Sequence, residues 1–278
     1  MTRIGTRGSA LALAQAEWVA ERLEGETELV RITTAGDRDA AVGDKSRWVS
    51  ALERALLADE IDVAVHSAKD VPAELAEGLE LAAIPEREDA RDAICGAPSL
   101  DALERGARVG TSSLRRAAQI RAVRPELEVV DVRGNVDTRL RKLAEGQFDA
   151  LVLAAAGLNR LGRPADGILD ELVPAAGQGA LALEARSGWG PPAELIDDEA
   201  TACVSAEREL VRELGASCNT PLGAHARLID GGELELTAWV GRPDGSAWLR
   251  DRFCGGPDRV GRLVAQRVLS AGGRELLA

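Results

Sequence analysis

Short apolar runs that end abruptly in polar residues alternate with helix-like segments through the first two thirds of the sequence. In the clearest case, the run 61–65 gives way to the polar-rich segment 66–70 and then to Pro72. Buried strands that lead into polar loops, with helices between them, are typical of a parallel α/β sheet. Ligands bind at the carboxyl ends of such strands, so Lys69 and Asp70 lie where chemistry could occur. The alternative is that both charges only solvate a loop.

The alternation predicts two α/β regions in succession. Strands are expected at 3–5, 28–34, 61–65, 107–110, 127–132, 148–154 and 180–185, and helices at 9–23, 49–57, 99–105, 111–123, 136–145 and 155–160. Ser9 and the hydroxyl run 111–113 are suitable helix N-caps. Segment 35–47 has no periodicity and predicts a loop, and the charged segment 85–92 predicts a crossing between domains.

The pattern of strands and helices changes after segment 189–192, whose glycine and prolines interrupt regular structure. A helix is predicted at 199–214 and another at 257–271. Between them, glycine-containing turns separate three strands, at 224–229, 233–240 and 247–253. This order predicts a small separate α+β domain with an antiparallel sheet.

Composition excludes several classes of protein. The net charge of −12 argues against nucleic acid as a general partner. No apolar stretch approaches the roughly 20 residues of a membrane span, and no signal segment is visible, so we expect a cytoplasmic protein. The cysteines form no CxxC pair and there are only two histidines, which argues against a zinc site or a disulfide framework. The four cysteines are Cys95, Cys203, Cys218 and Cys254.

Arginine recurs at the predicted strand ends of this acidic chain. Arg7, the run 111–116, Arg133 with Arg139, and Arg160 all follow expected strands. A lone surface arginine is ordinarily just solvated. Four strand ends with the same chemistry instead predict a cation-lined cleft between two α/β domains, because guanidinium groups bind carboxylates bidentately. The ligand would be a small polyanion.

Several chemistries remain open at this point. Cys218 lies in a glycine-bounded loop, and an inert, half-buried thiol is the alternative to a functional one. A Ser–His–Asp triad has weak support because no nucleophile elbow surrounds Ser67, and a pairing of Cys218 with His225 has little more. The two surviving classes are a two-lobed solute-binding protein and an enzyme with Asp70 as its acid/base. A carboxylate and a loop thiol beside a cationic cleft favour the enzyme.

Seven motifs, in order, resemble the hydroxymethylbilane synthase (porphobilinogen deaminase) family over essentially the whole chain. They are segments 4–9 with 11–15, 65–72, 109–116, 133–140, 156–162 and 177–179, and the loop around Cys218. The resemblance implies an α/β fold with two periplasmic-binding-protein-like (type II) domains and a small C-terminal α+β domain with a three-stranded antiparallel sheet. The implied bounds are 1–85 with 180–197, then 89–175, then 199–278.

The implied activity is a transferase reaction of haem biosynthesis. Four porphobilinogen molecules would be condensed head to tail, with release of ammonia, to the linear tetrapyrrole hydroxymethylbilane. Cys218 would hold a covalent dipyrromethane primer. The resemblance further implies a monomer without a metal, with uroporphyrinogen III synthase, the next pathway enzyme, as a candidate partner.

The motif matches also imply residue roles. Asp70 would be catalytic, stabilising the cationic azafulvene that forms as ammonia leaves. Cofactor contacts are expected from Lys69, Thr111, Ser113, Arg115 and Arg116. Substrate contacts are expected from Arg7, Ser9, Arg133, Arg139, Arg160 and Gln178. The predicted loop at 35–47, with the residue that follows it, departs from the family pattern of two lysines and a phenylalanine. Lys45 matches one lysine, but Ala41, Asp44 and Trp48 differ.

Overall fold

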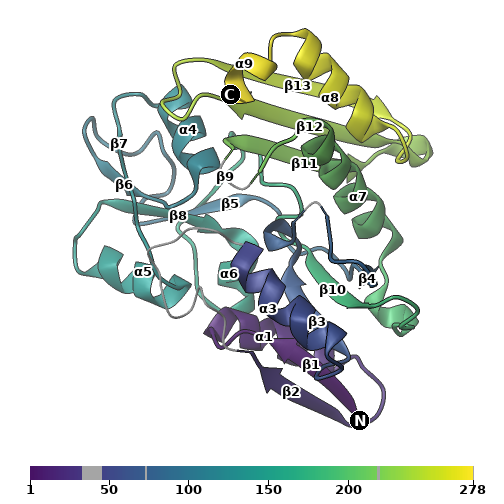
Figure 1. The fold of residues 1–278 in the computed structure, drawn as a ribbon. Coiled ribbons are helices and arrows are strands. Elements are labelled where there is room, and N and C mark those ends of the chain that lie inside the picture. The colour runs from purple at the N-terminus through teal and green to yellow at the C-terminus, as the bar shows by residue number, and fades with distance from the viewer. Residues whose placement is uncertain (33–45, 73, 218–219, 278) are drawn as a thin grey trace. The chain divides into compact units, whose positions relative to one another are not determined.

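A computed structural model of the chain describes residues 1–32, 46–72, 74–217 and 220–277 (Figure 1). The chain divides into two compact units. The first comprises residues 1–88 and 179–201, and the second comprises residues 89–178 and 202–278. The loop residues 41 and 44–45, singled out above, lie outside the described residues, as do Cys218 and Asn219.

The first unit is built on a five-stranded sheet in the order β2-β1-β3-β10-β4. Its strands are β1 (Thr2–Thr6), β2 (Thr27–Arg31), β3 (Val63–Ser67), β4 (Leu79–Ala83) and β10 (Leu181–Arg186). Its helices are α1 (Ala10–Ala20), α3 (Ser46–Leu57) and the short 3₁₀ segments η1 (Ala68–Asp70) and η2 (Ala193–Leu195). Strands β2, β1 and β3 are parallel, whereas β10 returns from far along the chain and lies antiparallel between β3 and β4.

Helices α1 and α3 cover opposite faces of this sheet. Val63 and Val65 of β3 belong to the same buried cluster as Ala16 and Val19 of α1. Ala64, which points the other way along the strand, is buried with Leu52 and Leu56 of α3. As predicted, Ser9 caps α1, and its hydroxyl accepts the N–H of Ala12 at 3.3 Å.

The α/β part of the second unit repeats this topology. Its sheet runs β7-β6-β8-β5-β9, with β5 antiparallel between β8 and β9. The strands are β5 (Asp92–Cys95), β6 (Arg108–Gly110), β7 (Glu128–Val130), β8 (Ala150–Ala154) and β9 (Gly167–Leu169). The helices are α4 (Leu114–Val123), α5 (Val136–Ala144) and α6 (Ala155–Arg160). The two sheets have the same strand order, and in each the strand at the fourth place in that order, β10 or β5, is antiparallel to its neighbours. This arrangement confirms the predicted type II fold class.

The predicted helix at 99–105 is wrong. The segment forms turns, in which the Ser99 hydroxyl accepts the N–H of Ala102 at 3.2 Å. One capped turn before Gly106, whose φ is 83°, is too short to nucleate a helix. Strand β9 was not predicted, because three residues carry too little pattern. A Cβ at its Gly167 would lie 2.0 Å from the carbonyl oxygen of Pro98.

The C-terminal part confirms the predicted helix, three antiparallel strands and helix. The sheet β11-β12-β13 comprises Leu222–Leu228, Leu234–Gly241 and Trp248–Gly255, with the 3₁₀ turn η3 (Asp230–Gly232) after β11. Helices α7 (Asp198–Glu213) and α8 (Val260–Ser270) bury one face of this sheet, and a short α9 (Arg274–Leu277) follows. In the β12–β13 turn, Gly245 has a φ of 74° and lies against α4.

Candidate active site

The segment that the sequence singled out forms a tight turn at the carboxyl end of β3. Lys69 and Asp70 lie in η1 and are half-buried. The turn is fixed at both ends by backbone bonds, since Ala68 donates to the carbonyl of Ala180 at 3.0 Å and Val71 donates to that of Ala68 at 3.2 Å. Two ionisable side chains are thus held on a short, anchored segment.

Arg7 and Ser9 occupy the junction between β1 and α1, as predicted. Both are half-buried, and Ser9 is the N-cap of α1. The first turn of a helix leaves backbone N–H groups that favour an anion, and α1 has no acidic residue there. Within the first unit this junction is therefore a cationic strand end with exposed donors.

In the second unit, Arg115 and Arg116 converge on one buried carboxylate that the sequence reading missed. Asp92 begins β5 and is fully buried, and the two arginines are only 5% and 6% exposed. Arg115 binds both carboxylate oxygens, with its Nη1 2.7 Å from Oδ2 and its Nη2 3.1 Å from Oδ1. The Nε of Arg116 donates to Oδ1 at 2.8 Å. Gln178 completes the cluster with an amide N–H that donates to Oδ1 at 2.8 Å.

This environment keeps Asp92 ionised. Burial alone would raise the pKa of the carboxyl, but the charges of Arg115 and Arg116 and their hydrogen bonds hold the pKa well below its ordinary value. Arg115 also donates to the carbonyl of Val173 at 2.7 Å, so the N-terminal end of α4 is tied to a distant loop. The cluster fixes where α4 begins.

Gln178 is buried and its amide group is used within the cluster. Its N–H groups donate to Asp92 and to the carbonyl of Ala90 at 2.7 Å, and its oxygen accepts from Arg115 at 3.3 Å and from Arg116 at 3.4 Å. The side chain therefore bridges the segment before β5 and the start of α4.

The other residues expected at this end of the sheet lie around the same helix start. Thr111 is buried, and its hydroxyl accepts the N–H of Ser113 at 3.2 Å. Ser113 is the N-cap of α4. Burial and then the positive charge of Arg116 lower the pKa of Arg139. Electropositive surroundings of this kind suit an anionic ligand.

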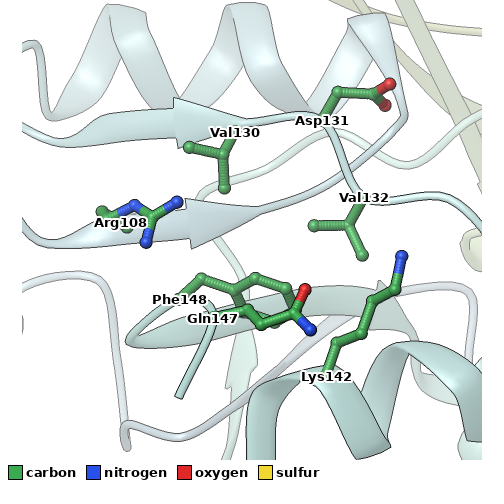
Figure 2. Close-up of a pocket in the computed structure, with 7 residues that line it drawn as sticks. All are labelled: Arg108, Val130, Asp131, Val132, Lys142, Gln147 and Phe148. Carbon is green, nitrogen blue, oxygen red and sulfur yellow. The ribbon is translucent and has the colours of Figure 1, made fainter. Parts of the chain in front are cut away.

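Arg133 and Arg139 are held by the turn that precedes α5. Asp131 accepts from the Nε of Arg133 at 3.0 Å, and Arg139 donates to the carbonyl of Gly134 at 2.7 Å. Lys142 donates to the carbonyl of Arg133 at 3.2 Å. Figure 2 shows Asp131 and Lys142 in the lining of a cavity of about 300 Å³ beside this turn. Its wall is completed by Arg108, Val130, Val132, Gln147 and Phe148.

Arg160 ends α6 and is half-buried. Cys218, the residue expected to carry the cofactor, lies outside the described residues. Of the remaining cysteines, Cys95 and Cys203 are buried, and burial raises the pKa of the Cys95 thiol to about 11. Cys254 is exposed. It lies on the exposed face of the edge strand β13.

Within the ranges that the structure describes, no group of three or more His, Cys, Asp or Glu residues could hold a metal ion. No helix among the described residues is long and apolar enough to cross a membrane.

The fold and the cationic side chains define a type II α/β protein with a site suited to an anionic ligand, and comparison with known proteins agrees with this class. Residues 2–190 match the family model "Porphobilinogen deaminase, dipyromethane cofactor binding domain", and residues 201–269 match "Porphobilinogen deaminase, C-terminal domain". The chain is 49% identical to porphobilinogen deaminase of Thiobacillus denitrificans and 47% identical to that of Deinococcus deserti. Each alignment covers 99% of this chain and 97% of the relative.

Solved structures give weaker likenesses. The periplasmic VFT2 domain of Bordetella pertussis BvgS aligns with a TM-score of 0.39 and 18% identity, over 68% of this chain and 81% of that domain. An arginine-specific periplasmic binding protein of Salmonella typhimurium aligns with a TM-score of 0.38 and 12% identity, over 67% of this chain and 85% of its own. No functional conclusion rests on these two.

The chain belongs to the porphobilinogen deaminase (hydroxymethylbilane synthase) family. It is accordingly a transferase that condenses four porphobilinogen molecules into hydroxymethylbilane with release of ammonia, and its cofactor is a covalently bound dipyrromethane. The excess of cations over carboxylates around the start of α4 fits such a group, because its acetate and propionate side chains need cationic partners.

Proposed function

We propose that the predicted residues divide the work of this reaction among themselves. Asp70 is the catalytic residue. The cofactor contacts are Cys218, Lys69, Thr111, Ser113, Arg115 and Arg116. The substrate contacts are Arg7, Ser9, Arg133, Arg139 and Arg160, and Gln178, predicted as a sixth contact, instead holds Arg115 and Arg116 in place.

The observation that carries this proposal is the concentration of cations at the start of α4. Two guanidinium groups share the single carboxylate of Asp92, and Arg139 lies close enough to Arg116 to have its pKa lowered by that charge. The single negative charge of Asp92 offsets only part of this positive charge, so further anionic groups would be stabilised here. Pyrrole acetate and propionate groups would supply those anions. The cofactor supplies the attachment point for the growing chain when it is bound.

Asp70 is suited to a different task, because η1 holds a carboxylate at a strand end. There it would face the positive charge that develops on the substrate pyrrole as ammonia departs, and it would accept and return the pyrrole proton. Lys69, its neighbour in the same turn, would bind a carboxylate. Gln178 has its amide committed to the arginine cluster, so its contribution would reach substrate through Arg115 and Arg116.

The test compares Asp70→Asn with Glu74→Gln, a matched loss of charge at an exposed residue of the same unit. General acid–base catalysis contributes about 10²- to 10⁴-fold, so Asp70→Asn should lower kcat by a factor in that range. The purified variant should keep its cofactor, seen as excess mass on the denatured chain. Glu74→Gln should retain the parent rate. Near-parental turnover in Asp70→Asn would remove Asp70 from the mechanism.

Further proposals concern the organisation of the chain. Residues 1–85 with 180–197, 89–175, and 199–278 form three domains, supported by the separate buried clusters of the three sheets. The chain acts as a monomer in the cytoplasm, since one chain supplies all the proposed residues. It passes hydroxymethylbilane to uroporphyrinogen III synthase. Sedimentation of the purified protein, alone and with that enzyme, tests the monomer and the partner.

A further inference from the structure

A group of three ionisable side chains, two buried and one half-buried, lies where α3 packs on the sheet of the first unit. His66 is on β3 and Glu184 is on β10, the neighbouring antiparallel strand, where Glu184 pairs with Ala64. Ala64 is buried against α3, and His66 lies two residues further along the same strand face. Glu53 comes from α3 itself. These residues have no place in the family motif roles assigned above.

The pair brings together three buried polar atoms that have no hydrogen-bond partner of ordinary geometry. Glu184 is fully buried, and its Oε2 lies 2.8 Å from Nε2 of His66. Among the described residues, Nε2 of His66 and both oxygens of Glu184 are without such a partner, this contact included. Two bare lone pairs at this distance would repel, and an isolated buried carboxylate is strongly unfavourable. A proton shared between Nε2 and Oε2 would remove both penalties.

Glu53 is a second carboxylate whose pKa this pair affects. Burial and then the negative charge of Glu184 raise the pKa of Glu53, while a hydrogen bond from the N–H of Ala76, at 3.3 Å, and the charge of His66 lower it. The titratable groups that act on one another here thus come from β3, β10 and α3. A change in the proton count of one alters the charge that the others experience.

The remaining contacts at the carboxyl end of β3 show which part of the structure the His66–Glu184 pair could hold in place. Gln15 of α1 donates to the hydroxyl of Ser67 at 3.2 Å, which holds β3 from the opposite face. The backbone bond from Ala68 to Ala180 holds it from β10. On the α3 side, His66 contacts Glu184. The turn that presents Asp70 begins at the very next residues, Ser67 and Ala68.

We propose that His66 and Glu184 share one proton and that this bond makes His66 a positioning residue for the turn carrying Lys69 and Asp70. The proposal rests on the catalytic role proposed for Asp70. Loss of the shared proton leaves Glu184 buried without a donor and frees the α3 side of the strand end. Asp70 then loses its fixed position relative to the reacting pyrrole.

The experiment uses the fact that the full chain has only two histidines, His66 and His225. In ¹⁵N-histidine-labelled protein at neutral pH, the ring signals of His66 are identified by their persistence in His225→Asn. A proton-bearing Nε2, or an unprotonated Nε2 whose signal changes on Glu184→Gln, is the expected result. An Nε2 signal that is unprotonated and unaffected by Glu184→Gln overturns the shared proton.

Activity is then measured for Glu184→Gln, His66→Gln and the control His225→Asn. The first two should lower kcat by about tenfold or more, because small misplacements of a catalytic group are costly, with KM little changed. Their kcat–pH profiles should differ in shape from the parent profile, whereas His225→Asn should keep it. Amide hydrogen exchange at Ala68 and Val71 should be faster in both variants.

Asp70→Asn, assayed in parallel, separates the two ways of failing. Full activity in Asp70→Asn refutes the proposed catalytic role, whatever the histidine variants do. Inactive Asp70→Asn, together with a parental rate, pH profile and exchange in Glu184→Gln, refutes the positioning role alone. If Glu184→Gln does not fold, the ring signals of the parent decide alone: a proton-bearing Nε2 supports the shared proton, and an unprotonated Nε2 overturns it.

Discussion

Replacing Asp92 by Asn is the perturbation whose consequence follows most directly from the structure. The exchange keeps the shape of the side chain and removes its charge. Oδ2 accepts from Nη1 of Arg115 at 2.7 Å, so an amide nitrogen at that position would place two donors against each other. Oδ1, which accepts from Arg116 and Gln178, can still be an acceptor. The loss therefore falls on the Arg115 pair and on the charge that both guanidinium groups share.

The magnitude is set by burial. All three residues are at most 6% exposed, so water cannot replace the lost partner. Removing one member of a buried ion pair costs about 3–5 kcal/mol, against a total stability of about 5–15 kcal/mol for folded proteins. We expect Asp92→Asn to lower the free energy of unfolding of the second unit by about 3–5 kcal/mol.

Urea unfolding, monitored by hydrogen exchange in β5 and α4, measures this loss in the second unit. The control is Asp137→Asn, which breaks an exposed ion pair with Arg163 at 2.9 Å in the same unit. Exposed pairs contribute about 0–1 kcal/mol, so the control should remain close to the parent.

The pH dependence gives a second, independent check. The folded-state pKa of Asp92 lies below its ordinary value of 3.8, so its stabilisation is complete above that value and is lost as the pH falls through the lower folded-state pKa. The difference between parent and Asp92→Asn should therefore shrink on acidification below about pH 4. Equal stabilities at neutral pH, or a difference that is constant down to strongly acidic pH, would refute the reasoning.

Three further predictions concern single side chains. Arg139→Met should raise KM for porphobilinogen by about tenfold or more, the loss expected of a charge-assisted contact, with little loss of stability, and unchanged KM in steady-state assays would exclude the contact. Brief treatment with N-ethylmaleimide should label exposed Cys254 and spare Cys95, whose thiol has a raised pKa of about 11; peptide mapping that finds Cys95 labelled first would contradict its burial. Gly245→Ala should lower the thermal midpoint, because φ is 74° and the new Cβ would lie 2.7 Å from the backbone nitrogen of Ala122. An unchanged midpoint would show that this turn does not pack on α4.

Local pattern was enough to predict most of the fold. The run 61–65 and the polar residues after it became β3 and η1, and the hydroxyl residues Ser9 and Ser113 became N-caps. These features depend on near neighbours in sequence, which hydrophobic periodicity and capping chemistry describe. The false helix at 99–105 came from the same local reasoning, applied to a segment too short to hold one.

The buried carboxylates could not be predicted in the same way. Asp92 stood in a charged segment that was interpreted as a crossing between domains. Its role depends on β5 lying between β8 and β9, a pairing that brings residue 92 to the start of α4. Glu184 did leave a signal, because it is the one charged residue in the apolar run 180–185. A lone charge in a buried strand needs a partner, and its partner, His66, lay on another strand.

The intact mass of the denatured protein tests the central claim most directly. A chain of this family should exceed its sequence mass by one dipyrromethane, and Cys218→Ser should lose that excess. If the purified protein lacks the group, incubation with porphobilinogen should add it to the parent and leave Cys218→Ser unchanged. A parent chain that stays at its bare sequence mass after that incubation, or a variant that gains the same mass, would contradict a covalent primer on Cys218.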